Sequence, residues 1–204
     1  MKKLSPVIAL SLAILFAFAC GGGATAPTPA ASAPPPVGKV LAWSGVAHRV
    51  MVTKLGLLDS TTTWEISNVT WVRDEDDEVG GLAGGQLFKI ASGHVKETIK
   101  QITGPCTVTG ETEFDLKPGD GRLIVAAGSY SGSISRRGGD EIHVDGDCGF
   151  GAGGTNLLST LELTIDSAGN DGGSASRLRG TKTDTIASSI HVSAWDFRAI
   201  AWED

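Results

Sequence analysis

Two short segments with a tryptophan at each end are the first candidates for a binding site. Residues 64–71 read WEISNVTW and residues 195–202 read WDFRAIAW, so four of the five tryptophans lie in these two segments. An exposed indole ring offers a flat apolar surface on which a sugar ring or another apolar ligand can stack. The candidate ligand-binding residues are therefore Trp64, Trp71, Trp195 and Trp202. The alternative is that both segments are core strands with similar packing needs.

The spacing of these tryptophans also constrains the backbone. Side chains seven positions apart on a regular strand point to opposite faces of the sheet. A β-bulge between them would bring both rings to one face, and Asn68 tolerates the backbone conformation that some bulges need. Two tryptophans on one face thus require a bulge within residues 64–71.

Acidic clusters are the second group of residues with candidate chemistry. Residues 74–78 read DEDDE and residues 145–147 read DGD, and carboxylate oxygens in glycine-rich loops suit Ca²⁺. Neither cluster has the spacing of an EF-hand loop, and a run of acids is commonly a solvated loop. Calcium is therefore a secondary hypothesis, and no other cofactor is expected. Its candidate donors are Asp74, Asp76, Asp145 and Asp147.

Motifs that would predict catalysis are weak. Residues 149–154 read GFGAGG and match the letters of a dinucleotide-binding loop, but an alternating strand pattern follows where that site needs a helix. The chain contains neither G-x-S-x-G nor H-E-x-x-H. A catalytic triad or a carboxylate pair assembled by the fold stays open, because such groups are recognised by geometry. No catalytic residue is nominated, and a binding protein is favoured over an enzyme.

The elements that must position these residues are strands. Residues 61–72, 107–116 and 157–165 are rich in Thr, Val, Ile and Leu, and residues 161–166 alternate apolar and polar side chains. Turn sequences such as PGDG at residues 118–121 separate these runs. We expect an all-β domain, an antiparallel β-sandwich of roughly 8–10 strands, with a closed β-barrel as the alternative.

The amino-terminal residues predict export. Two lysines precede an apolar run over residues 6–19, which is too short for the ~20 residues of a membrane span but suits a secretory signal. Residues 17–20 read AFAC, which resembles the lipobox of bacterial lipoproteins, with Phe18 where a small residue is usual. The resemblance implies cleavage before Cys20 and a lipid anchor on that cysteine. Gly21, where an Asp would favour the inner membrane, implies the outer membrane or the cell surface.

The chain therefore divides into three parts. Residues 1–19 are the expected signal peptide, and residues 20–38 are the lipidated cysteine with its tether. The tether over residues 21–38 has no charged residue and holds five of the eight prolines, which is typical of a stiffened spacer. Residues 39–204 are the all-β domain. In an oxidising compartment its Cys106 and Cys148 are expected to form a disulfide, and two buried free thiols are the alternative.

Charge narrows the choice of partners. The net charge of −6 argues against nucleic acid and anionic surfaces as partners. We expect a lipid-anchored envelope protein whose domain is a non-enzymatic binding or envelope-interaction module with a polysaccharide or protein partner. The alternatives are a surface hydrolase that acts on polysaccharide, with Asp145 and Asp147 in its site, and a purely structural envelope protein.

Overall fold

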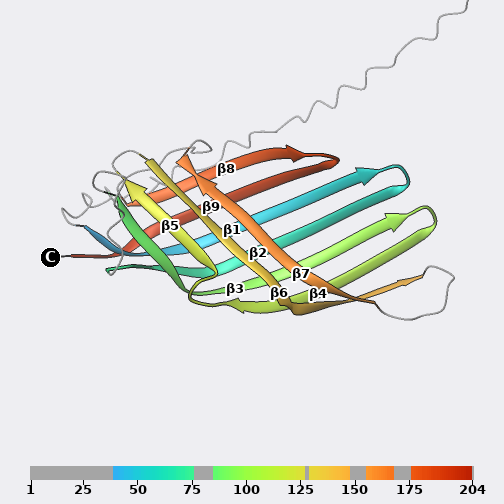
Figure 1. Ribbon diagram of the computed structural model, residues 1–204, viewed down its shortest axis with the longest axis horizontal. Helices are drawn as coiled ribbons and strands as arrows, with labels where there is room; N and C mark the ends of the chain where they lie inside the picture. Colours follow the sequence, from blue (N-terminus) through green and yellow to red (C-terminus); the bar gives the residue numbers. More distant parts are fainter. Residues whose placement is uncertain (1–38, 76–84, 127–128, 148–154, 168–175, 204) are drawn as a thin grey trace, which may run out of the picture. The chain divides into compact units, whose positions relative to one another are not determined.

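The Thr-, Val- and Ile-rich runs of the sequence form nine antiparallel strands in the computed structural model (Figure 1). The model describes residues 39–75, 85–126, 129–147, 155–167 and 176–203. This confirms the all-β class and the expected number of strands. Within the described residues, no helix is long and apolar enough to cross a membrane. The strands are β1 (Val40–Leu55), β2 (Leu58–Arg73), β3 (Gln86–Thr103), β4 (Cys106–Leu116), β5 (Gly121–Ala126), β6 (Ser129–Asp147), β7 (Thr155–Asp166), β8 (Arg177–Ile186) and β9 (Ser189–Trp202).

All nine strands belong to one sheet. The main path through the sheet runs β4-β6-β5-β3-β2-β1-β9-β8, and β7 pairs with β6. Both β4 and β5 pair with β3 on one side and with β6 on the other, so they lie end to end between these neighbours. The strands β7 and β8 each have a single neighbour in this pattern, and they form the two edges of the sheet.

The sheet is strongly curled into an open half-barrel, in which β5, β6 and β7 cross over β1, β2 and β9 (Figure 1). Side chains bridge the gap between its edges. The Nζ of Lys182 on β8 lies 2.8 Å from a carboxylate oxygen of Asp166 on β7. The hydroxyl of Tyr130 on β6 donates to the carbonyl oxygen of Arg179 on β8 at 3.0 Å. The core is thus enclosed between two parts of one curled sheet rather than between two separate sheets.

The bulge required by the tryptophan spacing is present in β2. Asn68 has a φ of 52°, and the pairing of β2 with β3 shifts register between Ser67 and Thr70. Trp64 and Trp71 are both buried as a result, with 3% and 0% of their surface exposed. Strand β2 thus has the bulge that two tryptophans on one face need.

The core is built largely from aromatic and branched side chains on the inner face. Trp71 contacts Phe197 edge to face with ring centroids 5.8 Å apart, and Trp43 contacts Phe88 in the same way at 6.2 Å. Such pairs contribute roughly 0.5–1.5 kcal/mol beyond the burial of their area. The aromatic pairs join strands β1, β2, β3 and β9 across the concave side of the sheet.

Candidate functional site

The inner face of the curled sheet changes from apolar to polar within two residues of β1. Ala47 lies in register between Trp195 of β9 and Ile66 of β2, and all three side chains are buried. Two residues further along β1, Arg49 lies in register between Ser193 and Trp64. Side chains two apart on a strand share a face, so the charged Arg49 points to the same side as the core.

A cavity of about 340 Å³ lies at this polar half of the inner face. Strands β1, β2, β3, β6, β7 and β9 all contribute to its lining. Met51, Ile99 and Ile142 supply apolar walls. The polar and aromatic residues that line it are Arg49, Thr62, Trp64, Glu97, Thr160, Glu162 and His191.

Arg49 and His191 form a partly buried pair in this cavity. The Nη2 of Arg49 lies 2.6 Å from the Nδ1 of His191. Burial lowers the pKa of His191, the neighbouring cation of Arg49 lowers it further, and Asp184 and Glu162 act in the opposite direction. A guanidinium group can only donate, so Nδ1 accepts and the neutral imidazole carries its proton on Nε2.

The same burial acts on Arg49. Desolvation lowers the pKa of its guanidinium, while the carboxylates of Glu162 and Asp184 raise it. An arginine stays charged in proteins, so the cavity holds a fixed cation beside a neutral histidine. The guanidinium carbon also lies 5.5 Å from the ring centroid of Trp64, within the range of a cation–π contact.

The lowered pKa of His191 predicts that the domain loses stability in mild acid. Below the ordinary histidine pKa of about 6.5, the unfolded chain takes up a proton that the folded chain resists. The free energy of unfolding therefore falls as the pH drops below about 6.5. Urea unfolding at pH 7.5 and 5.0 measures this loss, and His191→Gln should lose less stability than the wild type. His48→Gln, which removes a histidine from the adjacent strand β1, controls for the loss of a histidine as such.

Glu97 is a buried carboxylate on strand β3. Only 3% of its surface is exposed, and it accepts a hydrogen bond from the hydroxyl of Ser159 on β7. Burying a charged group is costly unless polar partners compensate for the lost water. Glu97 was not among the site residues predicted from the sequence, although its two-residue spacing from Val95 and Ile99 places it on the apolar face of β3.

Two buried N–H groups on cavity-lining residues lack a hydrogen-bond partner among the described residues. They are the Nε of Arg49 and the Nε1 of Trp64. A buried donor without an acceptor costs roughly 1–3 kcal/mol, so native proteins rarely leave one unsatisfied. Both nitrogen atoms are covered by protein atoms and do not face the cavity, so a ligand would contact them only after neighbouring side chains moved.

The tryptophans named from the sequence are core residues rather than an exposed platform. Trp64, Trp71 and Trp195 are 0–3% exposed, and Trp202 is partly buried against the core. The indole N–H of Trp195 donates to the hydroxyl of Tyr130 at 3.1 Å. Of the four, only Trp64 lines the interior cavity.

The two candidate calcium donors whose side chains the structure describes, Asp74 and Asp145, each contact a basic side chain of the protein. Asp74 follows β2 and pairs with the Nζ of Lys89 at 2.5 Å. Asp145 is exposed and pairs with His143 at 3.2 Å. The sequence predicted a turn at Asp145, but this residue lies within strand β6, in register with Thr109 of β4. An extended strand does not wrap its oxygens around one ion as a loop does, which corrects this part of the prediction.

The structure does not describe the side chains of the other two candidate calcium donors. Asp76 lies outside the described residues, and the side chain of Asp147 is not described. Within the part of the chain that the structure describes, no group of three or more His, Cys, Asp or Glu side chains could hold a metal ion.

One of the two cysteines of the expected disulfide lies among the described residues. Cys106 is the first residue of β4, and the next residue, Thr107, pairs with Asp147 of β6. Cys148 lies outside the described residues, so the disulfide stays a prediction. Thiol labelling of the denatured, unreduced protein should find no reactive Cys106 or Cys148, and labelling after reduction should find both. Reaction of either cysteine before reduction would contradict the disulfide.

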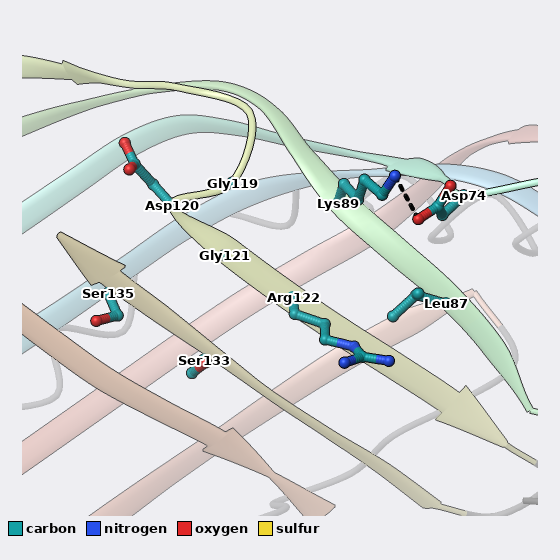
Figure 2. A pocket seen from close by; sticks show the side chains of 9 residues that line it. All are labelled: Asp74, Leu87, Lys89, Gly119, Asp120, Gly121, Arg122, Ser133 and Ser135. Carbon is teal, nitrogen blue, oxygen red and sulfur yellow. Dashed lines mark ion pairs between the residues drawn. The ribbon is translucent and has the colours of Figure 1, made fainter. Parts of the chain in front are cut away.

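A second hollow lies where the chain turns between β4 and β5 (Figure 2). It measures about 300 Å³ and is lined by Lys89, Arg122 and two aspartates. Of these, Asp74 pairs with Lys89, and Asp120 lies 3.3 Å from the Nη1 of Arg136. Both of its carboxylates are thus paired with cations of the protein, which leaves this hollow less suited to a charged ligand than the interior cavity.

A third hollow is larger, but none of its lining residues carries a buried donor that lacks a hydrogen-bond partner. It measures about 480 Å³ and crosses β8, β9, β1 and β2 around Val46, His48 and Arg179. Among the described residues, the buried side-chain groups without a partner belong to Trp43, Arg49, Trp64 and Trp71, and none of these residues lines it. Arg49 and Trp64 are lining residues of the interior cavity, although their unpartnered nitrogen atoms do not face it.

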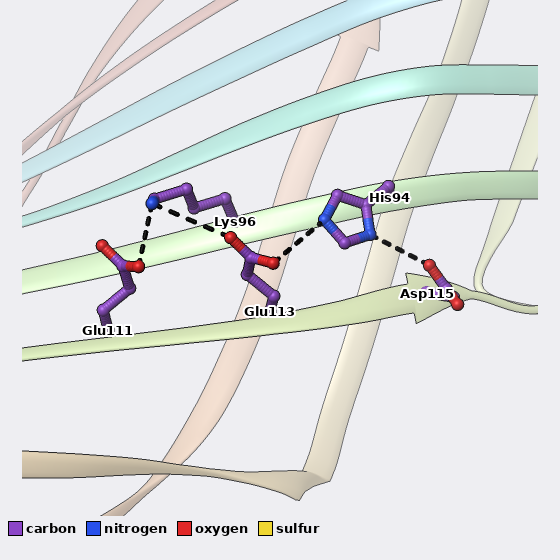
Figure 3. Close-up of polar contacts among 5 residues, drawn as sticks. All are labelled: His94, Lys96, Glu111, Glu113 and Asp115. Atoms are coloured by element: carbon purple, nitrogen blue, oxygen red, sulfur yellow. Dashed lines mark hydrogen bonds and ion pairs between the residues drawn. The ribbon is translucent and has the colours of Figure 1, made fainter.

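Charged side chains on β3 and β4 form a ladder rather than a site (Figure 3). Lys96 lies 2.8 Å from Glu111 and 3.7 Å from Glu113, and His94 lies 3.6 Å from Glu113 and 3.0 Å from Asp115. The hydrogen bond to Glu111 raises the pKa of Lys96. Exposed pairs of this kind contribute little to stability, so their main effect is to favour this register of the two strands.

Comparison with known protein families, curated proteins and solved structures finds no match to this chain.

Proposed function

We propose that this protein is a lipid-anchored binding module of the cell envelope whose ligand enters the interior cavity. The observation that carries the proposal is the cluster of Arg49, His191, Glu97 and Glu162 around one hollow of about 340 Å³. Arg49 and Glu97 are charged side chains on the buried face of the sheet, where an apolar side chain would avoid the cost of desolvation. Polar groups retained at a cost to stability are typical of functional sites.

The size and the mixed lining of the cavity support this proposal. Charged and polar side chains from β1, β3, β7 and β9 lie beside the apolar side chains of Met51, Ile99 and Ile142. The volume lies at the lower end of the ~300–1,000 Å³ that is typical of small-molecule sites. The ligand is therefore a small polar molecule or the end of a longer envelope polymer.

The binding proposal is tested on the protein extracted from membranes in mild detergent. Native mass spectrometry should detect a copurifying small molecule that is released on denaturation, and Arg49→Leu should abolish it. The matched control is Arg122→Leu, which removes an arginine outside the cavity and should leave the bound mass unchanged. Detection of the same mass in both variants, or of none in the wild type after incubation with envelope extract, would contradict binding in the cavity.

The anchor is proposed from the residues around Cys20 alone. Two or more acyl chains would hold the domain at a membrane, since one chain binds only marginally. The intact mass of the membrane-bound protein should equal the chain from Cys20 onward plus acyl groups, and Cys20→Ser should release the domain from the membrane. A mature chain that begins at Cys20 without added mass would contradict lipidation.

A polysaccharide hydrolase is the second candidate, because two carboxylates from different strands line the same cavity. Glu97 on β3 is buried and Glu162 on β7 is exposed, so their environments differ as those of a general acid and its partner do. A hydrolase would release reducing ends from envelope polysaccharide, and Glu162→Gln would abolish the release. Binding without release would favour the binding module.

A further inference from the structure

Strands β8, β9 and β1 lie side by side in the sheet, and their outer face, opposite to the core, carries exposed apolar and cationic side chains (Figure 1). We infer that this outer face, the membrane face, lies against an anionic lipid surface, an inference that depends on the proposed lipid anchor. It concerns a surface distinct from the interior cavity, and it fixes which side of the domain meets the membrane.

The membrane face contains a continuous apolar patch. Among the described residues, six of the nine exposed large apolar side chains belong to these three strands: Val46, Leu55, Ile186, Ile190, Val192 and Ile200. Ile190 and Val192 point to one side of β9, because side chains two apart share a face. They are in register with Val52 and Val50 of β1, so the four side chains form one patch. Contiguous exposed apolar side chains are typical of a contact surface.

Three arginines lie around a single carboxylate on the same face. Arg177 and Arg179 of β8 are in register with Arg198 and Asp196 of β9. The Nε of Arg177 donates to a carboxylate oxygen of Asp196 at 2.8 Å. This hydrogen bond lowers the pKa of Asp196, and the nearby charges of Arg198 and Arg179 lower it further. Three cations and one carboxylate leave an excess of positive charge, and guanidinium groups are well suited to bind phosphate.

The negative charge of the outer surface lies on other strands. Strand β1 has no acidic residue, and Asp196 is the carboxylate among the described outward-facing residues of β8 and β9. Acidic side chains gather instead on β4, in the ladder of Glu111, Glu113 and Asp115 (Figure 3). The net charge of −6 is therefore a property of the whole chain and not of the membrane face.

The tether joins the domain beside the membrane face. Lys39 directly precedes β1, and its carbonyl oxygen accepts from the backbone N–H of Glu203, just beyond β9. The tether over residues 21–38 can reach ~55 Å at about 3.1 Å per residue. The 16 residues of β1 span a similar length, ~55 Å at about 3.4 Å per residue. An anchor on Cys20 therefore allows the whole length of this face to contact the membrane that holds it.

Two matched labelled variants test the inference on the mature, lipidated protein in phospholipid vesicles. Thr183→Cys lies on the membrane face, in register with Val192, and Thr109→Cys lies on an exposed position of β4. Each new thiol carries a fluorophore, which nitroxide-labelled lipid quenches on contact. In vesicles of phosphatidylcholine with phosphatidylglycerol, we expect quenching at position 183 and none at position 109. Equal quenching at the two positions, or none at position 183, would overturn the inference.

A pair of double variants tests the part played by the arginines. Arg179→Gln with Arg198→Gln should lower the ratio of quenched to unquenched label at position 183 by about thirtyfold, the effect of removing two basic residues from an anionic membrane surface. Arg122→Gln with Lys100→Gln removes two exposed cations from β5 and β3 and should leave the ratio unchanged. Equal effects of the two double variants would contradict a specific role of this face.

A second copy of the chain could cover the same face, and cross-linking detects this outcome. Efficient disulfide formation between two chains through Thr183→Cys would show that the face is a contact between copies, and it would overturn the inference. Predominantly uncrosslinked protein in the same vesicles agrees with contact between the face and lipid.

Failure of this inference can be told apart from failure of the proposed anchor, because the intact mass is measured on the same preparation. If acyl groups are present and the label at position 183 is not quenched, the membrane face is wrong and the anchor stands. If acyl groups are absent and the label is not quenched, both are wrong. Loss of the copurifying molecule in Arg49→Leu tests the cavity independently of either result.

Discussion

Replacing Trp71 by alanine is expected to lower the free energy of unfolding by about 3–5 kcal/mol, the usual cost of deleting a large buried aromatic side chain. The ring is fully buried and contacts Phe197 edge to face. Its Nε1 has no hydrogen-bond partner among the described residues, so the loss comes from packing and not from a broken hydrogen bond. Urea unfolding of Trp71→Ala, followed by far-UV circular dichroism, measures the change.

Trp202 provides a matched control for this prediction. It occupies the same position in residues 195–202 as Trp71 does in residues 64–71, but it is only partly buried at the edge of the core. Trp202→Ala should cost about 1 kcal/mol, the ordinary size of a single substitution. Equal losses in the two variants would mean that the two rings contribute equally to the core. That result would contradict the difference in burial between Trp71 and Trp202.

Replacing Gly45 by alanine is expected to destabilise the sheet by more than about 3 kcal/mol, beyond the usual range for an added methyl group. A Cβ atom at Gly45 would overlap the carbonyl oxygen of Asp196 and lie 2.8 Å from the Cα of Phe197. These are backbone atoms of the adjacent strand β9, so no side-chain rotation can relieve the clash. The pairing of β1 with β9 must open, and thermal unfolding of Gly45→Ala reports the loss.

Gly93 is the control for the second prediction. A Cβ atom there would lie 2.8 Å from the Cδ1 of Leu116, which is the end of a flexible side chain that can move. Gly93→Ala should change stability by less than about 1 kcal/mol, because the gain from replacing glycine in a strand offsets part of the clash. A Gly45→Ala variant as stable as Gly93→Ala would mean that β1 and β9 are not paired in this register.

The class of fold and one detail of backbone geometry followed from local sequence. Alternating polar and apolar residues with turn sequences between them predict antiparallel strands, and nine were found. The spacing of Trp64 and Trp71, with Asn68 between them, indicated where a bulge is needed if both rings share a face, and β2 has a bulge there. Both inferences depend on a few neighbouring residues, so they need no knowledge of which strands pair.

Functional residues were harder to predict from the sequence. The tryptophans were named as a binding surface because they are large and repeated in pattern, but burial depends on the face toward which a strand turns. Glu97 could have been found, since it interrupts the apolar face between Val95 and Ile99. The candidate donors near Asp145 were assigned to a loop because DGD is common in turns, whereas pairing with β4 keeps them in a strand.

The sequence by itself indicated an all-β domain over residues 39–204, the need for a bulge within residues 64–71 if both tryptophans share a face, and a lipobox-like segment at residues 17–20. Only the tertiary structure decided that one sheet curls to enclose a cavity and that Arg49 meets His191, 142 residues away. The physical reason is that strand periodicity is a local property, readable from residues two apart. The pairing of β1 with β9 and the approach of β7 depend on long-range contacts, which the local pattern does not specify.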